Sequence, residues 1–318
     1  MEQADTLLDR AFGKANKGKL KVSGEYLHRK SIVESEKVKT VYTTLHVDLH
    51  NIMSNFPQVD ELPVFYTELF KASIDVHNFK KSLGAVGWVD QQSGKFTKFY
   101  YAKIRNSRSI ADILLHKRGF YGRVSSAVKQ IRKELEFLES SRKIIRRFPD
   151  VKVNLPTVII AGFPNVGKTT LLSSLTGANP KIASYPFTTQ SLMFGYLQVR
   201  GVKTQLVDTP GLLDRPLNKR NKIELHSILA LKYLEGKTIF VLDPTETCGF
   251  TLEEQLSLLK DIDNTFKVSL VILNKSDIAG KELIGMARKK LGEFKVVEAS
   301  ADKKTGIEEI RSAFENFI

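Results

Sequence analysis

The sequence is poor in cysteine and contains no long apolar run. Cys248 is the only cysteine among the 318 residues, which excludes a disulfide within the chain and a cysteine-rich zinc site. No stretch of about 18 apolar residues suggests a helix that crosses a membrane. The first 21 residues carry acidic side chains near their start and no apolar segment of the secretory type. We therefore expect a cytoplasmic protein without a membrane partner.

Charge is plentiful and unevenly distributed. The chain holds 49 Lys and Arg against 35 Asp and Glu, a formal net charge of +14. Residues 1–150 hold 27 basic and 17 acidic side chains, and residues 101–150 alone hold 13 and 5. A local positive potential of this kind attracts polyanions such as RNA. A charge-rich helix surface is also common as a merely solvated face, and that interpretation stays open.

A domain boundary is predicted where the character of the sequence changes. Pro149 and Pro156 bracket a segment in which helix is disfavoured. A chain of 318 residues is also longer than one compact core usually organises. We place a basic N-terminal helical domain at residues 1–153 and a second domain at residues 154–318.

The first domain has helical periodicity. A helix is predicted over 41–56, and Asp60 is predicted to cap a following helix with Pro63 in its first turn. The last helix carries an apolar seam at alternating spacings of four and three residues: Val124, Val128, Ile131, Leu135 and Leu138. Because such a seam requires partner helices, we expect an all-α helical bundle.

Another side of that last helix is basic. At about 100° per residue, its lysines and arginines fall away from the seam and are interrupted by Glu136. We regard them as candidate RNA contacts: Lys129, Arg132, Lys133, Lys143 and Arg147.

The second domain alternates short β-branched runs with helical segments. Strands are predicted over 157–161, 191–199, 203–208, 237–243, 266–274 and 294–299. Helices fill the intervals, for example over 252–260 and 305–317. This alternation predicts an α/β domain with a mainly parallel, six-stranded sheet flanked by helices.

A glycine-rich segment, GFPNVGKTT, directly follows the first predicted strand. Its Gly162, Gly167, Lys168 and Thr169 fit the pattern G-x-x-x-x-G-K-[ST] of a phosphate-binding loop. The glycines let backbone N–H groups point at phosphate oxygens, and the following helix N-terminus adds positive partial charge. We expect Lys168 to contact the β- and γ-phosphates and the Thr169 hydroxyl to ligate magnesium. The other loop positions are expected to line the nucleotide: Phe163, Pro164, Asn165, Val166 and Thr170.

Two later segments fit the same phosphate site. In DTPG, Asp208 is placed to hold magnesium through water and Gly211 to offer its N–H to the γ-phosphate. Between the two lies YPFTTQS, where a switch needs a hydroxyl that reaches both magnesium and the γ-phosphate. We favour Thr189 over Thr188 for this role, with Phe187 beside them. The alternative for both threonines is β-propensity at the entry to the next strand.

The base is expected to be guanine. In NKSD, the Asp277 carboxylate can accept hydrogen bonds from the ring N–H and the exocyclic amine of guanine, a pair that adenine does not offer. Asn274 is expected to reach the base edge and the phosphate loop, and the stem of Lys275 to pack against the ring. In ASA, Ser300 is expected to brace the Asp277 region, and the Ala301 N–H to meet the guanine carbonyl.

These motifs in this order resemble the Nog family of nucleolar GTP-binding proteins and their archaeal counterparts, within the Obg-like superfamily of translation-factor-class GTPases. The resemblance is strong from about Phe56 to Asp263. It rests on five segments: FPQVDELPVFYTEL, GFPNVGKTTLL, YPFTTQSL, DTPGLLDRPLNKRN and DPTETCGFTLEEQL.

The resemblance implies a GTP-hydrolysing switch in maturation of the large ribosomal subunit. GTP, GDP and magnesium would be its ligands, and ribosomal RNA or the pre-ribosomal particle its partner. Eukaryotic members carry a long extension beyond the GTPase domain, whereas this chain ends at Ile318, so we expect an archaeal-type member. A monomer without a DNA partner is expected. Two alternatives stay open: a regulatory GTPase whose helical domain docks a protein, and a translation-linked GTPase of the same superfamily.

The hydrolytic step is expected to be slow. Many GTPases place Gln after the DxxG glycine to orient the attacking water, and here Leu212 stands in that position. In several related GTPases, Asn at the position of Asn165 helps to hold potassium beside the phosphates, where a cation offsets developing charge. An Asn that only stabilises the loop is the alternative. Basic residues just after Leu212 are expected to move with nucleotide state: Arg215, Lys219, Arg220 and Lys222.

Overall fold

The chain folds into a helical unit and an α/β unit. A computed structural model describes residues 3–18, 22–177, 180–184, 191–215, 222–234 and 236–316. The first unit comprises Met1–Glu61 and Ile74–Ile145, and the second comprises Leu62–Ser73 and Arg146–Ile318. Over the described residues the first unit is entirely helical and the second is mixed, which is the fold class expected from the sequence.

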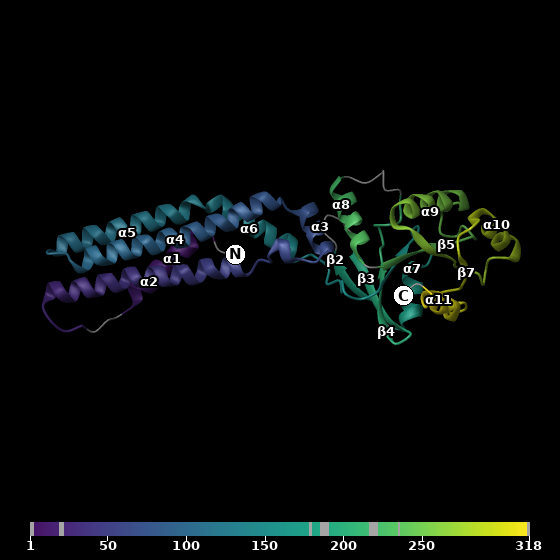
Figure 1. Cartoon of the computed structure of the whole chain (residues 1–318), viewed down its shortest axis with the longest axis horizontal. Helices are drawn as coiled ribbons and strands as arrows, with labels where there is room; N and C mark the ends of the chain where they lie inside the picture. The colour runs from purple at the N-terminus through teal and green to yellow at the C-terminus, as the bar shows by residue number, and fades with distance from the viewer. Residues whose placement is uncertain are drawn as a thin grey trace. The chain divides into compact units, whose positions relative to one another are not determined.

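The helical unit contains α1 (Ala4–Lys17), α2 (Tyr26–Ser54), α4 (Val76–Arg105), α5 (Ile110–Gln130) and α6 (Arg132–Ile145). The long helices α2, α4 and α5 lie side by side (Figure 1). Asp75 caps α4 by accepting from the Asn78 N–H, and Ser109 caps α5 by accepting from the Asp112 N–H. These caps satisfy backbone donors that would otherwise have no partner at the helix start.

The predicted last helix is in fact two helices. All five residues of the apolar seam are buried, with 0–4% of their surface exposed, but α5 ends at Gln130 and Ile131 leaves helical geometry with ψ of 19°. The Leu135 N–H still bonds to the Ile131 carbonyl, so the apolar spacing continues through the break and hides it.

Asp60 does not cap the helix that follows it. It lies in the 3₁₀ turn η1 (Val59–Glu61) and forms an ion pair with Lys80 at 2.7 Å, and α3 (Val64–Ser73) begins later. The prediction of an N-cap at Asp60 was therefore wrong, because Lys80 binds the Asp60 carboxylate and α3 begins only at Val64.

The helix α3 belongs to the α/β unit, although the boundary placed from the sequence assigns it to the first domain. It packs against α8 (Lys222–Ala230) and η3 (Leu231–Tyr233), and Phe65 and Leu69 enter the core of that unit. The Tyr66 hydroxyl lies 2.8 Å from the Pro149 carbonyl and accepts from the Val151 N–H at 2.9 Å. Aromatic burial and these bonds hold α3 on the α/β unit.

The sheet has seven strands in the order β2-β3-β4-β1-β5-β6-β7. Their bounds are β1 Thr157–Ala161, β2 Lys181–Ser184, β3 Ser191–Val199, β4 Val202–Asp208, β5 Gly236–Leu242, β6 Val268–Leu273 and β7 Val296–Glu298. Strands β4, β1, β5, β6 and β7 are parallel to one another. At one edge of the sheet, β3 pairs antiparallel with β4, and β2 pairs antiparallel with β3. The predicted count of six missed β2, a four-residue edge strand without an apolar run.

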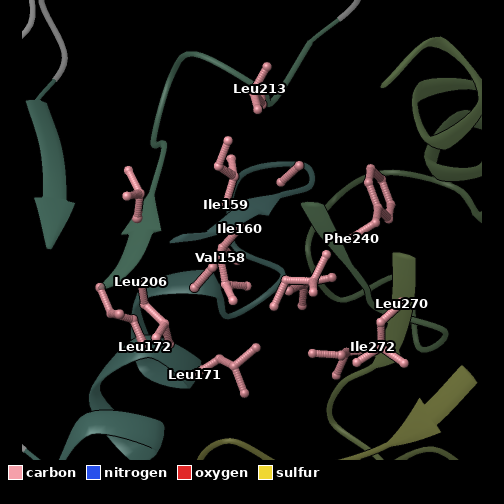
Figure 2. Packing of buried hydrophobic residues seen from close by; sticks show 14 of the residues in the cluster. Val158, Ile159, Ile160, Leu171, Leu172, Leu206, Leu213, Phe240, Leu270 and Ile272 are labelled. Atoms are coloured by element: carbon pink, nitrogen blue, oxygen red, sulfur yellow. The ribbon is translucent and has the colours of Figure 1, made fainter. Parts of the chain in front are cut away.

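The core of the α/β unit lies on both faces of the sheet, around β1. All five residues of β1 are buried, as expected for a strand with parallel neighbours on both sides. Figure 2 shows Leu171 and Leu172 of α7 (Lys168–Thr176) on one side of β1 and Leu213 on the other. The remaining helices of the unit are α9 (Leu252–Phe266), α10 (Lys281–Leu291) and α11 (Ile307–Phe314).

Every helix in the described ranges is too short or too polar to span a lipid bilayer.

Candidate nucleotide-binding site

Four motifs assigned to the site from the sequence, and the DPTET segment that was quoted only for the family resemblance, follow the carboxyl ends of five adjacent parallel strands. DTPG follows β4, the glycine-rich loop follows β1, DPTET follows β5, NKSD follows β6 and ASA follows β7. Because parallel strands end at the same edge, these loops form one crevice, the position where open α/β sheets bind ligands.

At two positions of the glycine-rich loop, the backbone conformation and the close neighbours leave no room for a side chain. Gly162 has φ of 140° and Gly167 has φ of 98°, and Asn165 is also left-handed at 62°. A Cβ on Gly162 would clash with the Val241 carbonyl, and one on Gly167 would clash with the Asn274 side-chain amide. Gly167 directly precedes α7, so the loop leads into a helix N-terminus, which favours an anion.

Lys168 is a buried cation within this loop. Only 6% of it is exposed, and its Nζ donates to the Gly162 and Phe163 carbonyls at 2.8 and 2.7 Å. Burial lowers the pKa of the Lys168 ammonium, and the charge of Asp208 opposes that shift. An ammonium held by carbonyls at the rim of an anion-binding loop can exchange those bonds for phosphate oxygens.

Thr169 and Asp208 come together from α7 and β4. The Thr169 hydroxyl donates to Asp208 Oδ2 at 2.5 Å, and Asp208 is completely buried. Its other oxygen, Oδ1, is buried without a hydrogen-bond partner among the described atoms. Burial raises the pKa of Asp208, against the bond from Thr169 and the charge of Lys168. An orphaned carboxylate oxygen beside a hydroxyl is a fitting donor set for magnesium.

Three predicted residues of this region, Phe187, Thr188 and Thr189, lie outside the residues that the structure describes. The same holds for Lys219 and Arg220, and the side chain of Lys222 is not described.

Asn274 joins the base motif to the phosphate loop. Its side-chain amide donates to the Val166 carbonyl at 2.8 Å, and its Oδ1 accepts from the Ala301 N–H at 2.9 Å. Only 2% of Asn274 is exposed. The contact predicted between the Ala301 N–H and a guanine carbonyl therefore competes with an internal hydrogen bond.

The other residues predicted to recognise the base lie at the same edge of the sheet. Asp277 is exposed and offers its carboxylate to a ligand. Ser300 is buried and accepts from the Lys303 N–H at 3.2 Å, which holds the ASA turn closed. Lys275 has φ of 60° and directs its ammonium to Asp243 at 2.7 Å.

The segment after DTPG is anchored in the core. Gly211 has φ of 74°, Leu212 and Leu213 are completely buried, and the Leu213 carbonyl accepts from the Gly162 N–H at 3.1 Å. Arg215 lies 3.7 Å from Glu224 of α8. The side chain of Leu212 thus belongs to the hydrophobic core of the α/β unit.

Sequence reasoning missed the site residues in the β5–α9 connection. Phe250 stacks on Phe163 of the phosphate loop, with ring centroids 4.0 Å apart and an interplanar angle of 24°. Asp243 pairs with Lys275, as described above. The motif DPTETCG was the available signal, because an acidic residue directly after a buried parallel strand lies at the crevice.

Of the five candidate RNA contacts, Arg147 belongs to the α/β unit, and three of the four on the helical unit are paired with acidic side chains. Arg132 lies 2.7 Å and Lys129 3.8 Å from Asp5, and Lys143 lies 4.0 Å from Glu139. The side chains of these three basic residues are 52–70% exposed, so the pairs are weak in water.

The comparisons with known proteins cover both units. Residues 1–152 match a family described as NOG1 N-terminal helical domain, and residues 157–275 match one described as 50S ribosome-binding GTPase. An uncharacterized protein of Methanocaldococcus jannaschii is 42% identical over 260 residues, which are 81% of this chain and 73% of that protein.

Eukaryotic relatives are longer. Nucleolar GTP-binding protein 1 of Encephalitozoon cuniculi is 33% identical over 87% of this chain and 53% of its own length. Nucleolar GTP-binding protein 1 of Arabidopsis thaliana is 34% identical over 83% of this chain and 40% of its own length. The chain thus spans about half, or less, of the length of these two relatives.

Proposed function

Because this chain belongs to the family of nucleolar GTP-binding protein 1 and its archaeal relatives, we propose that it is a GTP-hydrolysing switch in assembly of the large ribosomal subunit. The observation that carries the proposal is the meeting of phosphate and guanine motifs in one crevice, joined by Asn274. The match of residues 157–275 to a 50S ribosome-binding GTPase supports the ribosomal part. We place the protein in the cytoplasm as a monomer.

Each side chain of the crevice has a role in this proposal. Lys168 and the N–H groups of the phosphate loop bind the triphosphate, and Asp277 selects guanine over adenine. Thr169, Asp208 and Thr189 would hold magnesium, which neutralises charge on the β- and γ-phosphates when bound. Potassium at Asn165 is a second proposed cation. Asn165 lies within the phosphate loop with φ of 62°, and its side chain is exposed, so it is accessible to a cation.

The switch would act through the segment after DTPG. Loss of the γ-phosphate removes contacts at Gly211 and Thr189, and the loops that carry them relax. The helix α8 follows directly and packs against α3. In turn, α3 is continuous in sequence with α2 on one side and α4 on the other, so a shift of α8 has a covalent route to the helical unit.

Intrinsic hydrolysis is expected to be slower than about 1 per second, and Leu212→Gln is expected not to accelerate it. The buried position of residue 212 directs a glutamine side chain into the core, where an unpaired amide costs about 1–3 kcal/mol of unfolding free energy. Single-turnover phosphate release and urea unfolding measure the two effects. Leu212→Met, which conserves volume, is the matched control. A tenfold faster Leu212→Gln variant would contradict the assignment.

RNA binding is proposed for the helical unit, and two basic surfaces compete for the role. One is the predicted face around Arg132 and Lys143. The other surrounds a hollow of about 460 Å³ at the α4–α5 turn, lined by Phe99, Lys103 and Arg108 among others. Lys103 Nζ lies 4.6 Å from the Phe99 ring, which is half exposed and offers a face on which a base can stack.

Cosedimentation with large-subunit particles tests the function. We expect the full chain to comigrate with them when a non-hydrolysable GTP analogue is present, and to dissociate with GDP. Reversal of charge in Lys103→Glu/Arg108→Glu is expected to weaken binding and to lower the salt slope by about 0.7–0.9 for each phosphate that the variant no longer neutralises.

The double variant Arg132→Glu/Lys143→Glu is the comparison for Lys103→Glu/Arg108→Glu, because acidic neighbours already offset the positive charges of Arg132 and Lys143. Persistent absence from the particles, in either nucleotide state, favours the rival in which the helical unit docks a protein.

A further inference from the structure

The connection between β5 and α9, residues 243–251, touches both halves of the nucleotide site. Phe250 stacks on Phe163 of the phosphate loop, and Asp243 and Thr247 contact Lys275 of the base motif. None of these contacts belongs to the strand pairing of β5, which ends at Leu242. A connection that reaches two site elements at once is in a position to set how both are held.

The Asp243 carboxylate is the centre of these contacts. It is completely buried, and its Oδ1 accepts from the Thr245 N–H at 2.9 Å. Its Oδ2 accepts from the Thr247 hydroxyl at 3.0 Å, from the Cys248 N–H at 2.9 Å and from Lys275 Nζ at 2.7 Å. Burial acts to raise the pKa of Asp243, but the bonds from Lys275 and Thr245 outweigh it and lower that pKa. The carboxylate is therefore a charged anchor at neutral pH.

The backbone that carries this carboxylate is also fixed. The buried side chain of Gln255, in α9, accepts from the Asp243 N–H at 2.8 Å and donates to the Asp243 and Phe250 carbonyls at 2.9 and 3.0 Å. Thr251 and Glu254 form a capping box at the start of α9. Both ends of the connection are thus held before any ligand binds.

We propose that Asp243 and Thr247 are positioning residues for guanine, acting through Lys275. By holding Lys275 Nζ, they fix the aliphatic stem of that lysine as one wall of the base pocket. The role rests on the proposed function, in which the stem of Lys275 lies against the guanine ring. The ligand concerned is a guanine nucleoside di- or triphosphate.

The physical gain is preorganisation. A free lysine side chain loses much rotamer freedom when it is ordered. When the ammonium is already bound at both Asp243 and Thr247, that cost is met during folding rather than during binding. Only 24% of the Lys275 side chain is exposed, which is consistent with a stem that is held in place.

A double-mutant cycle tests the role, with GDP affinity measured by titration calorimetry on the full chain. Asp243→Asn keeps the shape of the side chain and weakens its hold on Lys275, and we expect GDP to bind about tenfold more weakly. Lys275→Met keeps the stem and removes the anchored ammonium, so a similar loss is expected. Because both changes break one anchor, the double variant should be no weaker than the worse single variant. If the losses of GDP affinity in the two single variants multiply in the double variant, the two residues act independently and the positioning role is wrong.

Two threonines supply a matched pair. Thr247→Val removes a bond to Lys275 and should weaken GDP binding about threefold. Thr245 bonds to the same carboxylate and to Thr247 but not to Lys275, so Thr245→Val should stay within about twofold. Since Thr247 is exposed, its variant tests the role even if Asp243→Asn fails to fold. Equal effects of the two threonine variants would contradict the role.

The same measurements distinguish failure of the proposed function from failure of the positioning role. A wild-type chain that binds no GDP overturns the proposed function and this role together. A wild-type chain that binds GDP, with Asp243→Asn and Thr247→Val binding equally well, overturns the positioning role alone.

Discussion

Gly167→Ala is expected to abolish GDP binding, with a loss of at least about 100-fold in affinity. The added Cβ meets the Asn274 side-chain amide, which cannot move without breaking its bonds to Val166 and Ala301. At φ of 98° the backbone is also strained for any residue with a side chain. The clash would displace both the loop that is proposed to offer N–H groups to phosphate and the motif that is proposed to read the base. Titration calorimetry with GDP measures the loss.

Gly177→Ala is the matched control, at the other end of the same helix. Its φ is 67°, so alanine carries comparable backbone strain, but the added Cβ would meet nothing within 4 Å. We expect a cost of about 1 kcal/mol in unfolding free energy and GDP affinity within about threefold of wild type. If both glycine variants lose GDP equally, the clash with Asn274 is not the cause.

Glu34→Gln is expected to destabilise the helical unit by about 3 kcal/mol at neutral pH. Glu34 is 1% exposed on α2, and three ammonium groups surround it: Lys30 at 3.1 Å, Lys37 at 3.3 Å and Lys117 of α5 at 2.7 Å. Burial acts to raise the pKa of Glu34, but the lysines outweigh it and lower the pKa from 4.5 to about 2. Glutamine fills the space without the charge that holds α2 to α5.

The direction of the pH dependence follows from that pKa. The folded unit holds Glu34 ionised down to about pH 2, whereas the unfolded chain protonates it near pH 4.5. Its contribution to stability is therefore complete above pH 4.5 and is lost as the pH falls toward 2. The difference between wild type and Glu34→Gln should shrink over the same window.

The single tryptophan makes this measurement specific to the helical unit. Trp88 lies on α4, so its fluorescence during urea unfolding follows that unit within the full chain. Glu36→Gln, two residues along the same helix and less buried, is the control and should change stability by less than about 0.5 kcal/mol. Equal stability of the two variants at pH 7 would refute the role of the buried cluster.

The sequence alone determined which segments carry the nucleotide-binding motifs and in what order. Glycine spacing, apolar runs and polar residues at strand ends are local properties, so they predicted the phosphate loop, the DTPG and NKSD motifs and the parallel sheet. The apolar seam that ends at Leu138 predicted the buried side of the helical unit for the same reason. The same local property explains why the break at Ile131 was missed. The spacing of apolar residues continues through a single residue that leaves helical geometry, so it does not reveal the break.

Only the tertiary structure decided which distant segments meet. Asp243 finds Lys275 across 32 residues, Asn274 finds Val166 across 108, and α3 joins a unit that resumes at Arg146. It also decided that Leu212 faces the core. Such contacts depend on strand order and on competition for buried space, and neither is written in the spacing of residues along one segment.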